Sequence, residues 1–201
     1  MAEEQQGVRV TRILYKEIVE GDRRKIRAQS NDSDTGGGAR DFRFGSYEQL
    51  LPVIKRMFPN VVKEPRRRGK AISRIDVFQG DFYWQRAGSG AVEHKSSFFE
   101  PPTDVRPSEG RIVRVHEYAC FDTKLIPPHG NGDRVLLLLI QRSDANVWPH
   151  FVTERSLRTP GEWDRTVAAE LLSCIDAARP ANRAVIGYRD FDSHESYCNG
   201  K

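Results

Sequence analysis

Strand-like segments separated by turn residues are the feature that most constrains the fold of this chain. These segments are rich in β-branched and aromatic residues, and Gly, Pro, Asp or Asn lie between them. Such residues favour strands. The clearest segments are Ala71–Phe78, Asp81–Gln85, Arg111–Phe121 and Arg134–Arg142. Strands at this spacing predict a barrel or a sandwich.

Helices are expected at two places. Ser46 is a candidate N-cap, followed by Glu48 in the first turn, for a short helix that runs through Met57. Between Gly161 and Ala178, apolar residues recur at helical spacing and predict a longer helix packed on the sheet. The expected fold is therefore α+β and mostly β, an open barrel with one short and one longer helix.

The length of 201 residues suits one domain. We expect a single domain over residues 1–189 and a flexible tail over residues 190–201. The segment Val8–Glu20 is compatible with either a helix or a strand, and Lys25–Gln29 alternates charged and apolar residues as a strand does.

Cysteine usage and hydropathy bear on the compartment. Cys120, Cys174 and Cys198 are far apart and outside any CxxC pair, which predicts free thiols in a reducing compartment. The first ten residues lack the basic flank and apolar stretch of a secretory signal. The longest apolar run, Val135–Ile140, is far shorter than the ~20 residues that cross a bilayer. We therefore expect a cytoplasmic protein without membrane contact.

Positive charge is concentrated in one segment. The formal net charge of +4 is mild, but Lys63–Lys70 (KEPRRRGK) holds five basic residues and one acid. Two interpretations stay open: a solvated loop, or a loop that contacts phosphates. The phosphate contacts would come from Lys63, Arg66, Arg67, Arg68 and Lys70.

The segment Ser30–Phe44 (SNDSDTGGGARDFRF) is too polar and glycine-rich for a core element. It lacks the GxxxxGK[ST] and GxGxxG patterns of phosphate-binding loops. Asp32, Asp34 and Asp41 are possible oxygen ligands, but a calcium loop that starts at Asp32 requires glutamate at its twelfth position, which is Arg43. We expect no bound metal here, and the Asn and Asp residues fit turns.

One short pattern suggests an endonuclease. In residues 91–97 (AVEHKSS), an acid, one intervening residue and a lysine resemble the second half of the PD-(D/E)xK nuclease signature. Asp76 would be the first acid, although it lacks the preceding proline. The resemblance implies a magnesium-dependent endonuclease in which Asp76 and Glu93 hold the metal and Lys95 orients or activates water.

Two polar segments that each follow a predicted strand suggest DNA recognition without cleavage. In the first, Arg40 and Arg43 can reach guanine edges or phosphates, and Asp41 can accept from a cytosine amine or hold Arg43. A mixture of donors and acceptors is what base-edge recognition requires. The second segment has the same mixture, in Gln85, Arg86, Glu93, His94 and Lys95.

Both segments also resemble a known family. The stretch KIRAQSNDSDTGGGARDFRF, followed by a helix ending in RMFP, resembles the amino-terminal DNA-binding pseudobarrel domain of EcoRII-type restriction endonucleases. The stretch DFYWQRAGSGAVEHKSS is similar to the aromatic strand and polar arm of that family. The resemblance implies two arms that grip the major groove, Asn31–Arg43 and Gln85–Ser97. The implied contact positions lie near Ala39, Arg40, Phe44, His94 and Lys95.

The resemblance has limits. The second arm is less dense in Arg and Lys than in the family, so no target sequence is implied, and residues after Ser143 have no counterpart. We expect sequence-specific binding of double-stranded DNA, without a cofactor, as a specificity component of a restriction or defence system with a separate nuclease subunit. The endonuclease and a protein-interaction module remain alternatives. The glycine-rich loop favours the DNA-binding interpretation, because a nuclease core does not require it.

Overall fold

The computed structural model describes residues 9–19, 21–22, 41–68, 71–85, 90–113 and 133–200. The strands are β1 (Val10–Glu17), β2 (Phe42–Phe44), β3 (Asn60–Arg68), β4 (Ala71–Gln85), β5 (Val92–Glu100), β6 (Gly110–Val113), β7 (Val135–Arg142), β8 (Val147–Thr153), β9 (Ile186–Asp190) and β10 (Ser196–Cys198). The helices are α2 (Tyr47–Met57), α3 (Glu154–Arg158) and α4 (Arg165–Ala178), followed by the 3-10 turn η4 (Arg179–Ala181). The expectation of a mostly β chain is confirmed, as are the short helix α2 and the longer helix α4, whereas α3 was not predicted.

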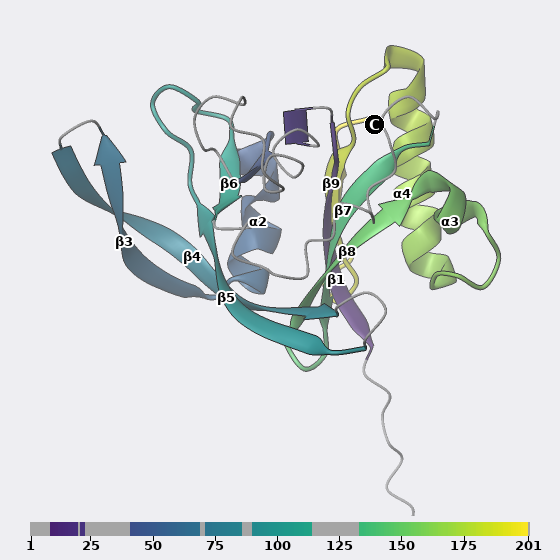
Figure 1. Cartoon of the computed structure of the whole chain (residues 1–201). Helices are drawn as coiled ribbons and strands as arrows, with labels where there is room; N and C mark the ends of the chain where they lie inside the picture. Colours follow the sequence, from purple (N-terminus) through teal and green to yellow (C-terminus); the bar gives the residue numbers. More distant parts are fainter. Residues whose placement is uncertain are drawn as a thin grey trace, which may run out of the picture.

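Within these ranges the strands form one curled sheet, a half-barrel (Figure 1). Their order is β10-β9-β1-β7-β8-β4-β5-β6-β2, and β3 pairs with β4 outside this path. Neighbouring strands are antiparallel except β4 and β8, which meet in parallel at Phe82 and Val147. We call the face that holds α2 the concave face and the face that holds α4 the convex face. None of the helices described has the length and apolarity needed to cross a membrane.

Strand β7 is buried on both faces and separates two hydrophobic cores. Val135, Leu137 and Leu139 belong to the concave core, whereas Leu136, Leu138 and Ile140 belong to the convex core. A strand covered on both faces reads as a continuous apolar run rather than as an alternation. This explains the apolar run Val135–Ile140 in the sequence. The neighbouring β1 pairs with β7, so Val10–Glu17, which the sequence left open between helix and strand, is a strand.

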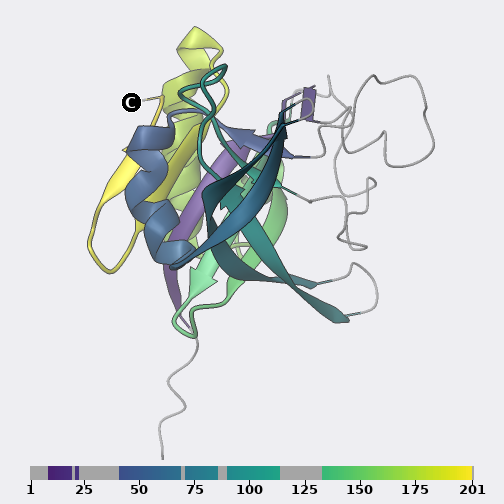
Figure 2. The same ribbon diagram turned by 90° about the vertical axis from the view of Figure 1, so that its left-hand side faces the viewer.

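Helix α2 lies inside the curl of the sheet, beside β9 and β10 (Figure 2). Its buried residues recur at helical spacing: Tyr47, Leu50, Val53, Ile54 and Met57. They pack with aromatic side chains of the concave core, where Phe58 and Phe99 lie with ring centroids 5.8 Å apart. Gly110 permits this packing, because a Cβ there would lie 2.5 Å from the ring of Phe99.

Ser46 is the N-cap residue of α2, as predicted, but its side chain does not cap the first turn. Ser46 has a left-handed backbone with φ of 55° and makes no side-chain cap hydrogen bond. Its hydroxyl instead accepts from Tyr197 at 3.0 Å, and the N–H of Tyr47 donates to the carbonyl of Ser108. Pro52 lies exposed within the helix, which continues past it.

Helix α4 covers the convex face. The carboxylate of Asp164 accepts from the N–H groups of Thr166 and Val167 at 2.9 and 3.0 Å, which satisfies two free donors of the first turn. The helix therefore begins at Arg165, and its apolar stripe packs on the convex core as predicted.

The predictions of a flexible tail and of free thiols are wrong where the structure describes them. Within the tail, β10 pairs with β9, and Cys198 forms a disulfide with Cys174 of α4 at a Cα separation of 5.9 Å. The two cysteines are 24 residues apart in sequence, and only the return of the chain through η4 and β9 brings them together. Cys120 lies outside the described residues.

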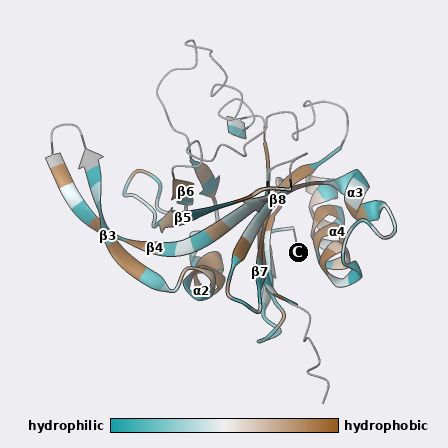
Figure 3. Ribbon diagram, turned by 60° about the horizontal axis from the view of Figure 1, so that its bottom comes forward, coloured by the Kyte–Doolittle hydropathy of each residue, from teal (hydrophilic) through white to brown (hydrophobic). Residues whose placement is uncertain are grey.

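The prediction that the basic segment Lys63–Lys70 is a loop is also wrong for residues 63–68, the part of it that the structure describes. Strand β3 pairs residue by residue with the first part of β4, from Asn60 opposite Gln79 to Arg68 opposite Ala71. We call the paired residues 60–68 and 71–79 the β3–β4 ribbon; it projects away from the rest of the sheet (Figure 3). The two strands predicted within Ala71–Gln85 are one strand. Gly80 does not form a turn between them; its lack of a side chain lets the ring of Phe58 pack closely against β4.

Candidate nucleic-acid interface

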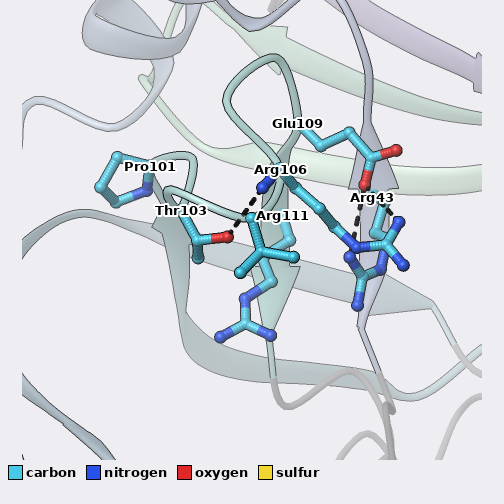
Figure 4. Close-up of a pocket in the computed structure, with 7 residues that line it drawn as sticks. Arg43, Pro101, Thr103, Arg106, Glu109 and Arg111 are labelled. Carbon is cyan, nitrogen blue, oxygen red and sulfur yellow. Dashed lines mark hydrogen bonds and ion pairs between the residues drawn. The ribbon is translucent and has the colours of Figure 1, made fainter. Parts of the chain in front are cut away.

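A small pocket lies between β2, β6 and the segment that joins β5 to β6 (Figure 4). Its volume is about 120 Å³. It is lined by Arg43, Pro101, Thr103, Val105, Arg106, Glu109 and Arg111. The arginines give the pocket planar, forked donor groups, which suit phosphate or carboxylate oxygens.

Strand alternation directs two of these arginines away from the concave core. Arg43 lies between Phe42 and Phe44, whose rings belong to that core, so its side chain points to the opposite face. Arg111 stands directly opposite Arg43 in the β2–β6 pair and therefore shares its face. Glu100 of β5 is opposite Arg111 on the other side. A row of charged side chains thus crosses three strands on the convex face.

Arg43 and Arg106 share one carboxylate. Glu109 lies 3.3 Å from the guanidinium of Arg43 and 3.0 Å from that of Arg106. Burial acts to raise the pKa of Glu109, but the hydrogen bonds from Arg106 and Arg43 lower it overall, so Glu109 is ionised at neutral pH. The backbone N–H of Arg106 donates to the carbonyl of Thr103, which fixes the turn that presents this arginine. Two cations around one anion leave this side of the pocket positive.

Arg111 is held from two sides. Its Nε and one terminal nitrogen donate to Glu100 at 2.8 and 2.6 Å, and the other terminal nitrogen donates to Asp41 at 2.9 Å. The same oxygen of Glu100 accepts from Arg66 at 2.9 Å. Asp41 and Arg66, both predicted to contact DNA, are buried in this internal network, with 5% and 9% of each residue exposed. Arg66 braces the ribbon against the end of β5.

The predicted second arm is partly a strand. Glu93, His94 and Lys95 lie in β5, where successive side chains point to opposite faces. Glu93 and Lys95 form an ion pair of 3.1 Å on the concave side, opposite Trp84 and Phe82. His94 points to the convex side. These three side chains therefore do not face one DNA groove together.

His94 ends a row of stacked groups on the convex face. Its ring stacks on Tyr83 at a centroid distance of 4.7 Å, and Tyr83 stacks on Trp148 at 5.5 Å. The guanidinium of Arg142 covers Trp148 at 4.5 Å. Nε2 of His94 also lies 3.4 Å from Asp81. The row spans β5, β4, β8 and β7 and holds the imidazole in one orientation.

The residues predicted for an endonuclease do not converge. Glu93 is paired with Trp84, which is eight residues from Asp76 along β4. At ~3.3 Å per residue, this separates the two positions by roughly 26 Å. Asp76 instead accepts from Lys63 at 2.9 Å. Among the described residues, no group of three or more His, Cys, Asp or Glu side chains is placed to hold a metal ion.

The remaining predicted contact residues are only partly described. Asn31, Ala39, Arg40, Lys70 and Arg86 lie outside the described residues. The structure places Arg67 and Arg68 at the end of β3 and Gln85 at the end of β4. Phe44, expected near the DNA, is fully buried in the concave core.

Sequence reasoning missed the side chains that complete the pocket. Arg106, Glu109 and Arg111 follow a Pro-rich stretch that matches no binding motif. Only the pairing of β2 with β6 brings them to Arg43, which the sequence had singled out.

The chain matches no known protein family, no curated protein and no solved structure.

Proposed function

We propose that this chain binds double-stranded DNA and that the pocket of Arg43, Arg106 and Arg111 contacts the phosphate backbone. The observation that carries the proposal is the sharing of Glu109 between Arg43 and Arg106, which leaves an excess of positive charge beside a preformed pocket. Guanidinium groups bind phosphate oxygens through paired hydrogen bonds. A phosphate oxygen that enters the pocket can take the place of the shared carboxylate.

The position of the pocket in the chain supports the same function. Arg43 is the last residue of the predicted first arm, Asn31–Arg43. Phosphate contacts fix the register of a protein on the duplex, and base edges are read by neighbouring residues. A phosphate contact at Arg43 would therefore position the first arm over the bases.

The second arm contributes through His94 in this proposal. His94 is six residues from Glu100 on β5 and points to the same face, so roughly 20 Å separates it from the charged row. That span is shorter than one turn of a duplex, about 34 Å. Glu93 and Lys95 point to the other face. The resemblance to the EcoRII-type domain is the reason to expect sequence-specific binding within a restriction or defence system.

The test is a titration of a random-sequence duplex of about 25 base pairs, followed by fluorescence anisotropy across a range of salt concentrations. We expect wild-type binding that weakens with salt. The variant Arg43→Gln/Arg106→Gln should bind at least about tenfold more weakly, with a salt slope reduced by about two. A matched control removes two exposed cations from the helical side, Arg155→Gln/Arg165→Gln, and should bind like the wild type.

The same titration distinguishes binding from cleavage. We expect equal affinity in EDTA and in magnesium, with intact DNA recovered from both. Equal losses in the pocket variant and in the control, or no binding by the wild type, would contradict the proposal. Magnesium-dependent cutting would replace it with an endonuclease that uses residues other than the separated pair Asp76 and Glu93.

A further inference from the structure

We infer that an unpaired base of the bound DNA stacks on the outer ring face of His94, with Asp81 as the acceptor for the amino group of that base. The inference rests on the proposed function and deepens it, since it names the form of DNA that the chain prefers: a duplex that contains an unpaired base. His94 lies on the convex face, as Arg43 of the pocket does, so one ligand on one face meets both.

The row of stacked groups is closed at one end. Tyr83 lies between Trp148 and His94, with ring centroids 5.5 and 4.7 Å away, and both pairs are stacked. The guanidinium of Arg142 covers Trp148 at 4.5 Å. Because β8 lies between β7 and β4, Arg142 and Tyr83 approach Trp148 from opposite sides. Each ring of the row except that of His94 therefore has a neighbour on both faces.

The row is open at His94. Its side chain is 51% exposed although Tyr83 covers one face of the ring. Strand β5 pairs with β6 only from Phe98 to Glu100, so within the described sheet no strand lies beside His94 on the side away from Tyr83. Val92, two residues away on the same face of β5, is 52% exposed. A planar group that stacks on the outer face of the imidazole would extend the row by one ring.

A nucleobase is the planar group that the proposed ligand supplies. Proteins hold unpaired bases by stacking them on aromatic side chains, histidine included, and every base has a ring face to offer. The row holds the imidazole of His94 in one orientation, so the ring does not have to be ordered when the base binds.

Asp81 supplies a polar contact at the edge of this stacking surface. Its Oδ1 lies 3.4 Å from Nε2 of His94 and accepts from the hydroxyl of Ser96 at 2.9 Å. The side chain of Asp81 is 53% exposed, and within the described part of the chain its Oδ2 accepts no hydrogen bond. A carboxylate accepts from base amino groups such as N4 of cytosine. Thymine carries no amino group, so we expect unpaired cytosine to bind more tightly than unpaired thymine.

The free-energy balance favours a base that is already unpaired over one extruded from a matched duplex. Stacking one base on an aromatic side chain strengthens binding by about fivefold to about 150-fold. Opening a matched pair costs free energy of the same order, which cancels that gain, whereas an unpaired base avoids most of the cost. The roughly 20 Å between His94 and the charged row corresponds to about six base pairs. The pocket can therefore hold a phosphate of the paired region while the unpaired base reaches His94.

The experiment compares three duplexes of about 25 base pairs: one matched, one with a single extra cytosine in the middle and one with a single extra thymine there. Fluorescence anisotropy at one salt concentration gives the three affinities. We expect the wild type to bind the cytosine duplex about tenfold and the thymine duplex about threefold more tightly than the matched one. In His94→Ala both ratios should fall to about one, whereas His94→Phe keeps a stacking ring and should keep about threefold for both.

The remaining variants separate the amino-group contact and the pocket from the stack. Asp81→Ala should lower the cytosine ratio to the threefold of thymine. The pocket variant Arg43→Gln/Arg106→Gln should weaken binding to all three duplexes by one factor and leave both ratios unchanged. His194→Asn is the control, because it replaces an exposed histidine outside the row and asparagine tolerates the left-handed backbone there. It should match the wild type on every duplex, and all variants should melt near the wild-type temperature.

The outcomes separate the inference from the proposed function. Equal binding of the three duplexes by the wild type overturns the inference and leaves the proposed function standing. Ratios that survive in His94→Ala, or that His94→Phe loses as completely as His94→Ala does, overturn stacking on this ring. A cytosine preference that survives in Asp81→Ala overturns the role of this carboxylate. If the wild type binds none of the duplexes, both the proposed function and the inference are wrong.

Discussion

Arg43 and Arg111 stand directly opposite each other on β2 and β6, although both are cations. Like charges at opposed positions destabilise an antiparallel pair. The carboxylates around them offset this repulsion unequally. Arg111 binds both Glu100 and Asp41, whereas Arg43 has the carboxylate of Glu109, which Arg106 also contacts. Glu109 therefore controls how much positive charge the pocket offers to a ligand.

Replacement of Glu109 by glutamine should strengthen DNA binding about fivefold. The variant removes a negative charge from the place where a phosphate would lie, and the repulsion between the two is about 1 kcal/mol. Folding should change little, by at most about 1 kcal/mol, since the pair with Arg106 is partly exposed. Anisotropy titration measures the first effect and urea denaturation the second. Glu162→Gln, an exposed position before α4, is the control. Weaker binding by Glu109→Gln would contradict a phosphate site.

Reduction of the disulfide between Cys174 and Cys198 should lower the free energy of unfolding by about 3 kcal/mol, as expected for a bridge across 24 residues. Urea denaturation with and without a reductant measures this difference. The variant Cys174→Ser should already show the lower stability and should not respond further to the reductant. Quantitative alkylation of Cys198 in the native, unreduced protein would show that the bridge is absent.

Asp190 should make the protein sensitive to strong acid. Burial alone would raise its pKa, but hydrogen bonds from the Ser193 N–H, Arg56 and Arg12 lower the pKa from 3.8 to about 2. The unfolded chain therefore takes up this proton first as the pH falls. The stabilisation, about 2 kcal/mol, is complete above about pH 4 and is lost towards pH 2. Denaturation of wild type and Asp190→Asn across this range measures it, and equal slopes in both proteins would contradict the assignment.

Protonation of His150 should lower the stability of the fold in a higher pH range than protonation of Asp190 does. Burial, with a smaller contribution from Arg142, lowers the pKa of its imidazole from 6.5 to about 4. The folded protein keeps the ring neutral where the unfolded chain is protonated, so stability falls as the pH drops from about 6.5 to 4, by about 3 kcal/mol. An NMR titration of the imidazole gives the pKa directly. A midpoint near 6.5 would show that the ring is not desolvated.

Gly110→Ala should destabilise the fold by about 1 to 3 kcal/mol, because the new methyl group would overlap the rings of Phe99 and Tyr47. Gly45→Ala is a matched control in the adjoining strand end, where the added atom would lie at an ordinary 3.6 Å from Ile186. Thermal melting compares the two variants. The control should melt close to the wild type, and equal losses in both would show that packing at Gly110 is not the cause.

Elements that depend on local periodicity could be predicted from the sequence. Contacts between segments that are far apart in the sequence could not. Helix α4 carries its apolar stripe and its Asp164 cap within a few residues of sequence. The pairing of Cys174 with Cys198 requires the path of β9, which no local pattern reveals. The basic segment Lys63–Lys70 carries a charge signal but no sign of its strand partner, so its ribbon form was missed.

The candidate site divides in the same way. Arg43 could be identified because it ends a distinctive polar loop, but the pocket requires the pairing of β2 with β6. Strand alternation in β5 separates His94 from Glu93 and Lys95, a distinction that a loop interpretation cannot make. Arg66 shows the limit of composition: its charge suggests a phosphate contact, whereas its burial next to Glu100 gives it an internal partner.

The ribbon also bears on how this protein behaves in concentrated solution. Within the described sheet, β3 pairs only with β4, so its other edge presents unpaired backbone groups to any neighbouring chain. Proteins protect such edges with lysine and proline, and β3 contains both, in Lys63 and Pro65. Mutual repulsion between the basic ribbons should oppose such pairing, and salt that screens this repulsion should favour edge-to-edge self-association.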